Sequence, residues 1–159
     1  TFIPGDAEQL SFPSGQDLIV SCSALQWFVS PELFFKRCNT LLSGHGYFAF
    51  STFGKENLKE IAAVTGSGLH YYSLEELKKS LSMHYNIVTA GEERIRLTFA
   101  TPLDVLYHLK HTGVTAVCRQ AWTKGDLQEF CDKYAKLFSC GNAVTLTYHP
   151  LYIIARKKP

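Results

Sequence analysis

Apolar positions in the first third of the chain form two short runs separated by a helical pattern. Residues 17–21 and 47–52 are compact apolar segments with β-branched and aromatic side chains, which favours buried strands. Between them, residues 31–43 repeat apolar side chains at helical spacing, with one face formed by Leu33, Phe34, Cys38, Leu41 and Leu42. This order of strand, helix and strand predicts a βαβ unit in an open parallel sheet.

The helix over 31–43 carries signals at both ends. Ser30 is suited to cap its N-terminus, and Pro31 to occupy the first helical position. At the other end, Gly44 is predicted to stop the helix, and residues 44–46 to form the turn into the second strand.

Helices and longer strands alternate in the rest of the chain. Ser73 and Glu76 form a capping-box pattern, which predicts a helix to about residue 81. Further helices are predicted over 55–64, 102–110 and 123–138. Alternating apolar positions predict a long strand over 85–100, and a last strand over 145–156 is expected to pair with it as an antiparallel hairpin.

Composition and charge exclude several classes of protein. The 159 residues are 46% hydrophobic and 19% charged, which suits a globular chain with one sizeable core. The 16 Lys and Arg residues against 14 acidic residues give a net charge of +2, with both signs spread along the chain, so no nucleic-acid surface is indicated. Apolar runs such as 18–20 are far shorter than the roughly 20 residues of a membrane helix, so no membrane contact is expected.

Cysteines and histidines form no metal-ligand pattern. The 5 cysteines have no C-x-x-C spacing, and no segment reads as a secretory signal, which favours reduced thiols in a cytoplasmic protein. His108 and His111 lack a carboxylate or a third ligand at useful spacing, so no metal site is predicted.

Candidate chemistry lies in the loops that follow the predicted strands, because ligands of open α/β sheets bind outside the carboxyl ends of the strands. The first such loop follows Ile3, where the opening residues read as the end of a strand. It carries Asp6 and Glu8, whose carboxylates can accept hydrogen bonds from an adenine amino group or from ribose hydroxyls. The second, residues 22–28, mixes small, polar and aromatic side chains, which suits close backbone approach beside a stacking wall.

Five segments carry a family resemblance. GDAEQLSFPSGQDLIVSCSALQWF and LLSGHGYFAFSTFG closely resemble class I S-adenosylmethionine-dependent methyltransferases, from the acidic loop after their third strand through their fifth strand. YYSLEELKKSL, HLKHTGV and VTLTYHPLYIIARKK resemble the malonyl-acyl-carrier-protein O-methyltransferases of biotin synthesis. The resemblance implies an α/β fold with a Rossmann-like methyltransferase sheet, mostly parallel with a C-terminal antiparallel hairpin. It also implies S-adenosyl-L-methionine as the cofactor and malonyl-acyl carrier protein as the partner.

The resemblance also assigns roles around the cofactor. Asp6 would accept a hydrogen bond from the adenine amino group, and the backbone amide of Ala7 would face the ring. Ser21 and Cys22, at the end of the 17–21 strand, would line the methionine moiety.

On the acceptor side, Gln26 and Trp27 would border the opening of the site where the methyl donor meets its acceptor. A buried position for Trp27, in the core beneath the next helix, is an equally good interpretation. The malonyl carboxylate is ionised at neutral pH and needs no general base, so the protein must mainly orient it. Candidates for this clamp are Lys110, Arg119, Tyr148 and His149. A basic surface that guides the acidic carrier protein could comprise Lys110, Arg119, Lys124 and Arg156, while residues 156–158 read as a solvated tail.

The sequence also departs from the family pattern. It contains no glycine-rich loop after a strand, and Gly66 and Gly68 do not substitute because a predicted helix precedes them. We therefore expect residues 1–159 to form a single, partial methyltransferase domain without the N-terminal strands. Those strands lie beside 17–21 in the family fold, so this edge is expected to pair with another copy of the chain or with a separately supplied upstream segment.

Three functions remain open from the sequence. The first is an O-methyltransferase that esterifies the free carboxyl of a malonyl thioester. The second is a small-molecule methyltransferase with another acceptor. The third is a non-catalytic interaction module, which the missing glycine-rich loop favours.

Overall fold

The computed structural model describes residues 2–114 and 122–159. The chain divides into two compact units, each with its own sheet and its own apolar core. Unit 1 comprises Thr1–Gly54, Tyr71–Glu92 and Pro150–Pro159, and unit 2 comprises Lys55–His70 and Glu93–His149.

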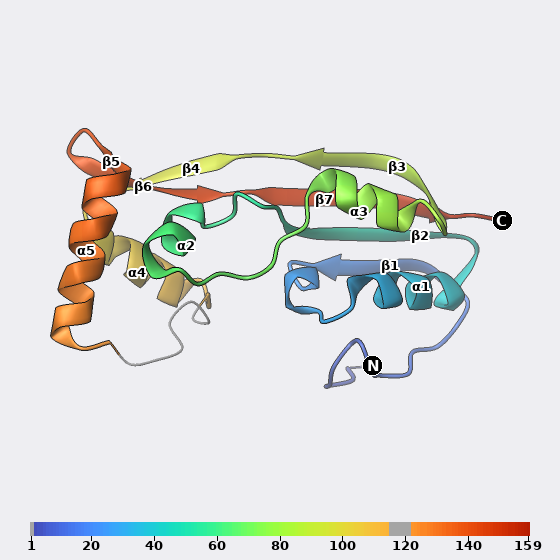
Figure 1. Cartoon of the computed structure of the whole chain (residues 1–159). Coiled ribbons are helices and arrows are strands. Elements are labelled where there is room, and N and C mark those ends of the chain that lie inside the picture. Colours follow the sequence, from blue (N-terminus) through green and yellow to red (C-terminus); the bar gives the residue numbers. More distant parts are fainter. Residues whose placement is uncertain (1, 115–121) are drawn as a thin grey trace. The chain divides into compact units, whose positions relative to one another are not determined.

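Unit 1 is built on a four-stranded sheet in the order β1-β2-β7-β3 (Figure 1). Strand β1 (Gln16–Cys22) runs parallel to β2 (Leu42–Phe53). Strand β7 (Pro150–Lys157) runs antiparallel to both of its neighbours, β2 and β3 (Tyr85–Glu92). Strands β1, β2 and β3 therefore point the same way with β7 reversed among them, which confirms the predicted mostly parallel sheet with an antiparallel C-terminal strand.

Helix α1 (Pro31–Leu41) covers the sheet of unit 1 through aromatic side chains. The Phe35 ring stacks on Phe50 of β2 with centroids 5.5 Å apart. Leu33, predicted to face the core, is 67% exposed, whereas Phe35 is 1% exposed. The two positions differ by about 200° around a helix, so both cannot be buried on one face. Unit 1 also contains the short 3₁₀ helix η1 (Leu25–Trp27) and α3 (Leu74–Leu81), which begins with the predicted capping box.

The turn predicted over residues 44–46 is instead part of β2, and α1 ends at Leu41 rather than at residue 43. Gln16 pairs with Leu42 but Leu18 pairs with Tyr47, so β2 carries additional residues here as a bulge. A Cβ atom on Gly46 would lie only 2.8 Å from the Gln16 carbonyl oxygen. The glycine at 46 therefore permits the two backbones to approach.

Strand β1 has an open edge in the part of the chain that the structure describes, because it pairs only with β2. Leu18 and Val20 are 56% and 57% exposed, so the prediction of a buried strand was wrong for these two residues. Only Ile19 packs against the core of unit 1 among the apolar residues of this strand. The open edge itself agrees with the sequence-based expectation for residues 17–21.

Unit 2 contains a three-stranded antiparallel sheet in the order β4-β6-β5. Its strands are β4 (Ile95–Phe99), β5 (Ser139–Cys140) and β6 (Ala143–Tyr148). Its helices are α2 (Lys59–Thr65), α4 (Pro102–His111) and α5 (Lys124–Phe138). Among the described residues, no helix has the length and apolar character required to traverse a bilayer, and no three His, Cys, Asp or Glu side chains are grouped to hold a metal.

Two predicted long strands are each divided between the units. The 85–100 strand separates into β3 and β4, and the 145–156 strand into β6 and β7. The second division has a local cause. The amide of His149 donates to the side-chain oxygen of Asn57 at 3.2 Å, and Pro150 has no amide hydrogen to donate.

The basic residues near the C-terminus are ordered, which contradicts the expectation of a solvated tail. Arg156 and Lys157 belong to β7. The Lys157 ammonium donates to the Leu42 carbonyl at 2.8 Å, and the Lys158 ammonium donates to the Ser82 carbonyl at 2.6 Å. Both carbonyls lie just beyond helix C-termini, where cations satisfy unpaired oxygens.

Candidate cofactor and acceptor sites

The carboxyl ends of the parallel strands of unit 1 share one edge of its sheet. Cys22 pairs with Ser51 near the end of β2, Phe53 pairs with Pro150, and Glu92 pairs with the next residue of β7. The chain also leaves unit 1 after Gly54 and after Glu92 and re-enters it at Pro150. Ligands of such sheets bind at this edge, so the cofactor residues are expected near it.

Asp6 organises the loop that precedes β1. Its Oδ1 accepts from the Glu8 amide at 2.9 Å, and its Oδ2 accepts from the Gln9 side-chain amide at 3.0 Å. The side chain is exposed. A carboxylate has about four acceptor positions, so these two bonds leave capacity for an adenine amino group. The adenine contact of Asp6 stays a prediction.

Glu8 has a different role from the one expected for an acidic pair with Asp6. Its carboxylate accepts from the amide of Val29 at 2.9 Å and from the amide of Ser30 at 2.8 Å. These amides stand at the N-terminus of α1, where negative charge is favourable. The Ser30 side chain makes no capping bond, so Glu8 takes the place of the predicted cap.

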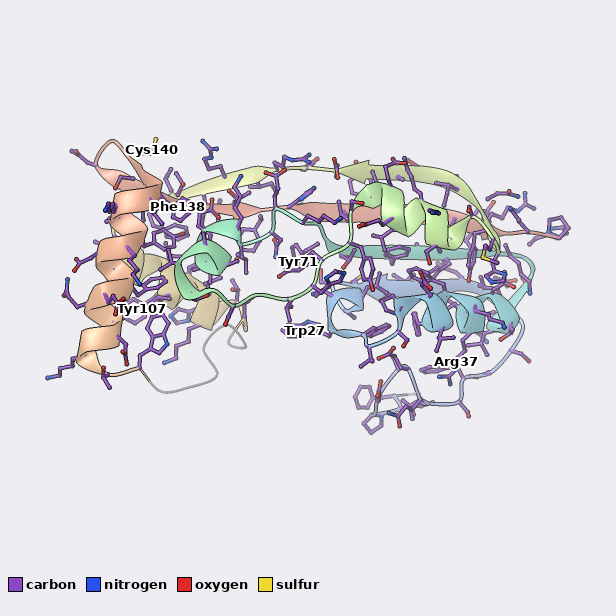
Figure 2. The ribbon with its side chains drawn as sticks, in the orientation of Figure 1. Trp27, Arg37, Tyr71, Tyr107, Phe138 and Cys140 are labelled. Atoms are coloured by element: carbon purple, nitrogen blue, oxygen red, sulfur yellow. The ribbon has the colours of Figure 1, made fainter. Side chains whose placement is uncertain are left out.

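Arg37 holds the same loop from the middle of α1 (Figure 2). Its Nη1 donates to the Glu8 carbonyl at 2.6 Å and approaches the Ala7 carbonyl at 3.4 Å. Its guanidinium carbon also lies 5.8 Å from the centroid of the Phe12 ring. No local motif reveals the role of Arg37, because its partners are carbonyls about 30 residues away in the sequence.

A pocket of about 460 Å³ lies between this loop, β1 and α1. Ala7, Ser21 and Cys22, three of the four predicted cofactor residues, are in its lining. Most of the other lining side chains are apolar, with Phe12 and Phe28 as aromatic walls. The size and apolar character are typical of small-molecule sites. No carboxylate among the described residues lines the pocket, so it offers no acidic partner for ribose hydroxyls.

Gln26 and Trp27 follow β1 on η1. The Gln26 amide nitrogen donates to the Ser23 carbonyl at 2.6 Å, and its oxygen accepts from the Thr52 hydroxyl at 3.1 Å. Gln26 therefore ties the loop after β1 to β2. Trp27 is 50% exposed (Figure 2), whereas Leu25 of the same turn is 2% exposed. The interpretation of Trp27 as a buried core residue was therefore wrong. Its position at the acceptor opening stays a prediction.

Tyr148, one of the clamp candidates, makes a polar contact with a side chain of α4 in unit 2. Its hydroxyl lies 3.0 Å from Nε2 of His108 on α4. The His108 ring lies 5.1 Å from the Phe99 ring of β4. Burial raises the pKa of the Tyr148 phenol, and a hydrogen bond with Thr112 opposes this only in part, so the hydroxyl keeps its proton at neutral pH.

Of the other clamp candidates, the two that the structure describes, Lys110 and His149, are not brought to this pair. Lys110 is exposed on α4, two residues after His108, so its side chain leaves the helix about 200° away from the His108 ring. Arg119 lies outside the described residues. His149 is 3% exposed, and its Nδ1 accepts from the Glu56 amide at 3.1 Å, which is a role within the fold of unit 2.

The residues expected to form a basic guiding surface are divided between the units: Lys110 and Lys124 belong to unit 2 and Arg156 to unit 1, while Arg119 lies outside the described residues. Arg156 pairs with Tyr47 at the start of β2, whereas Pro150 pairs with Phe53 at its end. At about 3.3 Å per residue, Arg156 lies roughly 20 Å along the strands from the carboxyl edge. Lys124 is exposed at the start of α5 in unit 2.

Comparison with known proteins finds relatives that match nearly the whole chain. A family model described as "Methyltransferase domain" matches residues 1–50. The malonyl-[acyl-carrier protein] O-methyltransferase of Bacteroides thetaiotaomicron is 56% identical over 99% of the chain and 64% of the relative. The protein of the same name from Bacteroides helcogenes is 55% identical over 99% of the chain and 58% of the relative. The chain thus spans roughly three fifths of the length of these relatives.

The fold comparison agrees. The crystal structure of a Bacillus halodurans protein assigned as a methyltransferase matches with a TM-score of 0.65 at 16% identity, covering 98% of this chain and 70% of that one. At this identity the likeness concerns the fold alone, and it confirms the expected α/β methyltransferase fold. Over nearly its whole length the chain is therefore similar to roughly three fifths of the proteins named malonyl-[acyl-carrier protein] O-methyltransferase, and its first 50 residues match a methyltransferase domain.

Proposed function

We propose that this chain supplies part of an S-adenosyl-L-methionine-dependent O-methyltransferase that esterifies the free carboxyl of a malonyl thioester on acyl carrier protein, in biotin synthesis. The observation that carries the proposal is the 56% identity, over 99% of the chain, to a relative that bears this name. The gathering of Ala7, Ser21 and Cys22 around one pocket supports it, because these three were assigned to the cofactor on separate grounds.

The reaction mainly requires that the protein align the methyl donor with the acceptor carboxylate. The methyl donor brings its own electrophilic methyl group, and the acceptor carboxylate is already ionised at neutral pH, so the protein needs no general base. In this chain Asp6 would hold the adenine amino group, while Ala7, Ser21 and Cys22 would line the donor beside the Phe12 and Phe28 rings. Gln26 holds the strand end in place, and Trp27 would face the acceptor.

The pocket supports one side of the donor site. Its lining has small residues and aromatic rings that fit the adenine and methionine moieties, but no carboxylate for the ribose. The glycine-rich loop of the family is not in this sequence either. We therefore propose that strong cofactor binding requires the portion of the relatives that lies outside the matched segment.

Calorimetric titration with S-adenosylhomocysteine tests the donor site. The samples are the 159-residue chain and a chimera that joins it, in the relative's own order, to the unmatched portion of the Bacteroides thetaiotaomicron protein. We expect the chimera to bind and Asp6→Ala to weaken binding about 5-fold, the effect of one lost hydrogen bond. Asp17→Ala is the matched control, because this exposed carboxylate accepts only from the Ser43 hydroxyl among the bonds described for it. Equal affinities in the Asp6→Ala and Asp17→Ala chimeras would remove Asp6 from the site.

Mass spectrometry of malonyl-acyl carrier protein tests the acceptor. We expect the chimera with S-adenosylmethionine to convert the malonyl thioester into its methyl ester and to leave an acetyl thioester unchanged. A chimera that binds S-adenosylhomocysteine but forms no ester would overturn the carrier-protein acceptor and favour a small-molecule methyltransferase.

The open edge of β1 supports a second partner. We propose that a further strand pairs there, from another copy of this chain or from a segment supplied upstream. The exposed side chains of Leu18 and Val20 support this, since an apolar sheet edge in water is a template for pairing. A non-catalytic interaction module would use the same edge, and it is distinguished by the failure of the chimera to bind S-adenosylhomocysteine.

A further inference from the structure

One face of the sheet in unit 1 is apolar and accessible. Side chains of directly paired residues in neighbouring strands lie on the same face of a sheet. Leu18 pairs with Tyr47, and Ala49 pairs with both Val20 and Ile154. Tyr152 shares the face of Ile154, because it lies two positions away on the same strand. The large apolar side chains of this surface, which we call the open face, are Leu18, Val20, Tyr47, Tyr152 and Ile154.

The open face is accessible even at the inner strands of the sheet. Strand β7 lies between β2 and β3 (Figure 1), yet Tyr152 and Ile154 are 45% and 38% exposed. On the opposite face of the same strand, Ile153 is 0% exposed, because it packs in the core that includes Phe35 of α1 and Leu77 of α3. The residues that the structure describes thus cover one side of this inner strand and leave the other accessible.

A bare apolar face is unusual for such a sheet. Strands β1 and β2 form a parallel pair, and parallel strands are normally buried on both faces. A contiguous apolar patch on a protein surface also tends to mark a place where another element or molecule packs. The open face is therefore expected to have an occupant.

The size of the open face argues against a second copy of the chain as that occupant. Its apolar side chains are each about half exposed, so covering them would remove roughly 100 Å² apiece from water, or roughly 500 Å² in all. A stable protein–protein interface buries about 800 Å² on each partner. A segment of the same polypeptide needs less area, because its effective concentration beside the face is high.

The relatives contain enough additional chain for such a segment. The present chain matches 64% and 58% of the length of the two Bacteroides relatives, so roughly two fifths of each lies outside the match. The sheet of unit 1 is about 15 Å wide at roughly 4.8 Å per strand spacing, and an α-helix crosses this width in about 10 residues. Arg156 pairs with Tyr47 at one end of the open face, where the negative end of a helix or an acidic side chain would be favourable.

We propose that an amphipathic helix from the unmatched portion of these relatives packs on the open face. Its apolar side chains recur at spacings of three and four residues and cover the open face, and its C-terminus or an acidic residue lies toward Arg156. This contact differs from strand pairing at the edge of β1, because it uses side chains of inner strands rather than unpaired backbone groups. The inference concerns packing and does not rest on the methyltransferase activity.

Hydroxyl-radical footprinting with mass spectrometry compares the 159-residue chain with the chimera described above. We expect oxidation of Tyr47 and Tyr152 to fall severalfold in the chimera, because the helix covers both rings. Tyr107, 53% exposed on α4, is the matched control and should be oxidised equally in both samples (Figure 2). Tyr134 is 0% exposed and should stay protected in both, which reports that each sample is folded. Equal oxidation of Tyr152 in the two folded samples would overturn the proposal.

Cross-linking identifies the occupant. A photoreactive benzoylphenylalanine in place of Tyr152 in the chimera should link to a helix of the unmatched portion of the relative. Links between two copies of the chimera would assign the open face to self-association instead. Links confined to the segment that matches the present chain would also overturn the proposal.

A charged substitution gives an independent measurement. We expect Ile154→Lys to lower the melting temperature of the chimera by about 5 °C or more and that of the 159-residue chain much less, because only the covered face buries the lysine. Leu33→Lys is the control, since Leu33 is 67% exposed on α1, which packs on the other side of the sheet. Equal melting temperatures of the Ile154→Lys and Leu33→Lys chimeras would contradict the packed helix. Each of these results can be read whether or not the chimera binds S-adenosylhomocysteine, so the proposed function and this inference fail separately.

Discussion

The carboxylate of Glu8 lies 2.8 Å from the backbone amide of Ser30, although the two residues are 22 positions apart. This bond joins the predicted adenine loop to the start of α1, and the Arg37 bond to the Glu8 carbonyl fastens the same residue from the other side. The loop that carries Asp6 is thus fixed before any ligand arrives. Such preorganisation lowers the entropy lost on binding.

Removal of the Glu8 cap should destabilise unit 1. We expect Glu8→Ala to lower the free energy of unfolding by about 1–2 kcal/mol, the usual range for a lost helix cap. Glu8→Gln keeps one acceptor oxygen and should lose about half as much. Urea unfolding followed by circular dichroism provides the measurement, with Asp17→Ala as the charge-matched control. A Glu8→Ala variant as stable as the control would contradict the capping role.

Replacement of Gly46 should destabilise unit 1, whereas replacement of Gly44 should not. A Cβ on Gly46 would meet the Gln16 carbonyl oxygen at 2.8 Å, whereas nothing lies within 4 Å of a Cβ on Gly44. We expect Gly46→Ala to cost about 1–3 kcal/mol, because a backbone atom must move, and Gly44→Ala to cost little. Thermal unfolding of the two variants is the test, and equal melting temperatures would exclude the close approach.

The buried carboxylate of Glu60 should depend on Thr147. Glu60 is 2% exposed, and it accepts from the Thr147 amide at 3.0 Å and from the Thr147 hydroxyl at 2.5 Å. Thr147→Val keeps the shape but removes the hydroxyl, so we expect a loss of about 1–3 kcal/mol. The exposed Thr98 on β4 provides the control Thr98→Val. Chemical denaturation of both variants tests this, and it fails if Thr147→Val costs no more than Thr98→Val.

Acid should weaken unit 2 through Glu56. Hydrogen bonds from Arg94 and then Lys59 lower the pKa of Glu56 from 4.5 to about 2. Because the folded pKa is the lower one, the stabilisation is present above pH 4.5 and is lost as the pH falls toward 2. Denaturation measured between these pH values should show a shallower acid slope in Arg94→Gln than in the parent. The difference should shrink in high salt, since the pair is exposed, and identical slopes in low salt would contradict the pairing.

Self-association through β1 should respond to a charge at its edge. Val20 on β1 and Val88 on β3 are both 57% exposed, and they lie on the two edge strands of the same sheet. We expect Val20→Lys to abolish concentration-dependent association in sedimentation velocity and Val88→Lys to leave it unchanged. A parent chain that is monomeric at every concentration would favour a partner strand supplied upstream.

Short-range patterns predicted the elements well, and long-range contacts explain the errors. The capping box of Ser73 and Glu76 spans three positions, so the sequence alone reveals it. The cap that Glu8 provides, and the division of the last strand where Asn57 binds His149, depend on residues 22 and 92 positions apart. Neither has a periodic signal. The same limit applied to the site, where Ala7, Ser21 and Cys22 came from family resemblance and the contact between His108 and Tyr148, 40 positions apart, was not predicted.

The connections at the carboxyl edge of unit 1 have an evolutionary consequence. Unit 2 consists of two chain segments, Lys55–His70 and Glu93–His149, each inserted between parts of unit 1. The pairing of β2, β3 and β7 therefore does not depend on the length of either inserted segment. Insertions and deletions in these two segments leave the strands of unit 1, which carry the proposed donor site, in register. Evolution can thus change the methyl acceptor through mutations in these two segments while the sheet of unit 1 stays unchanged.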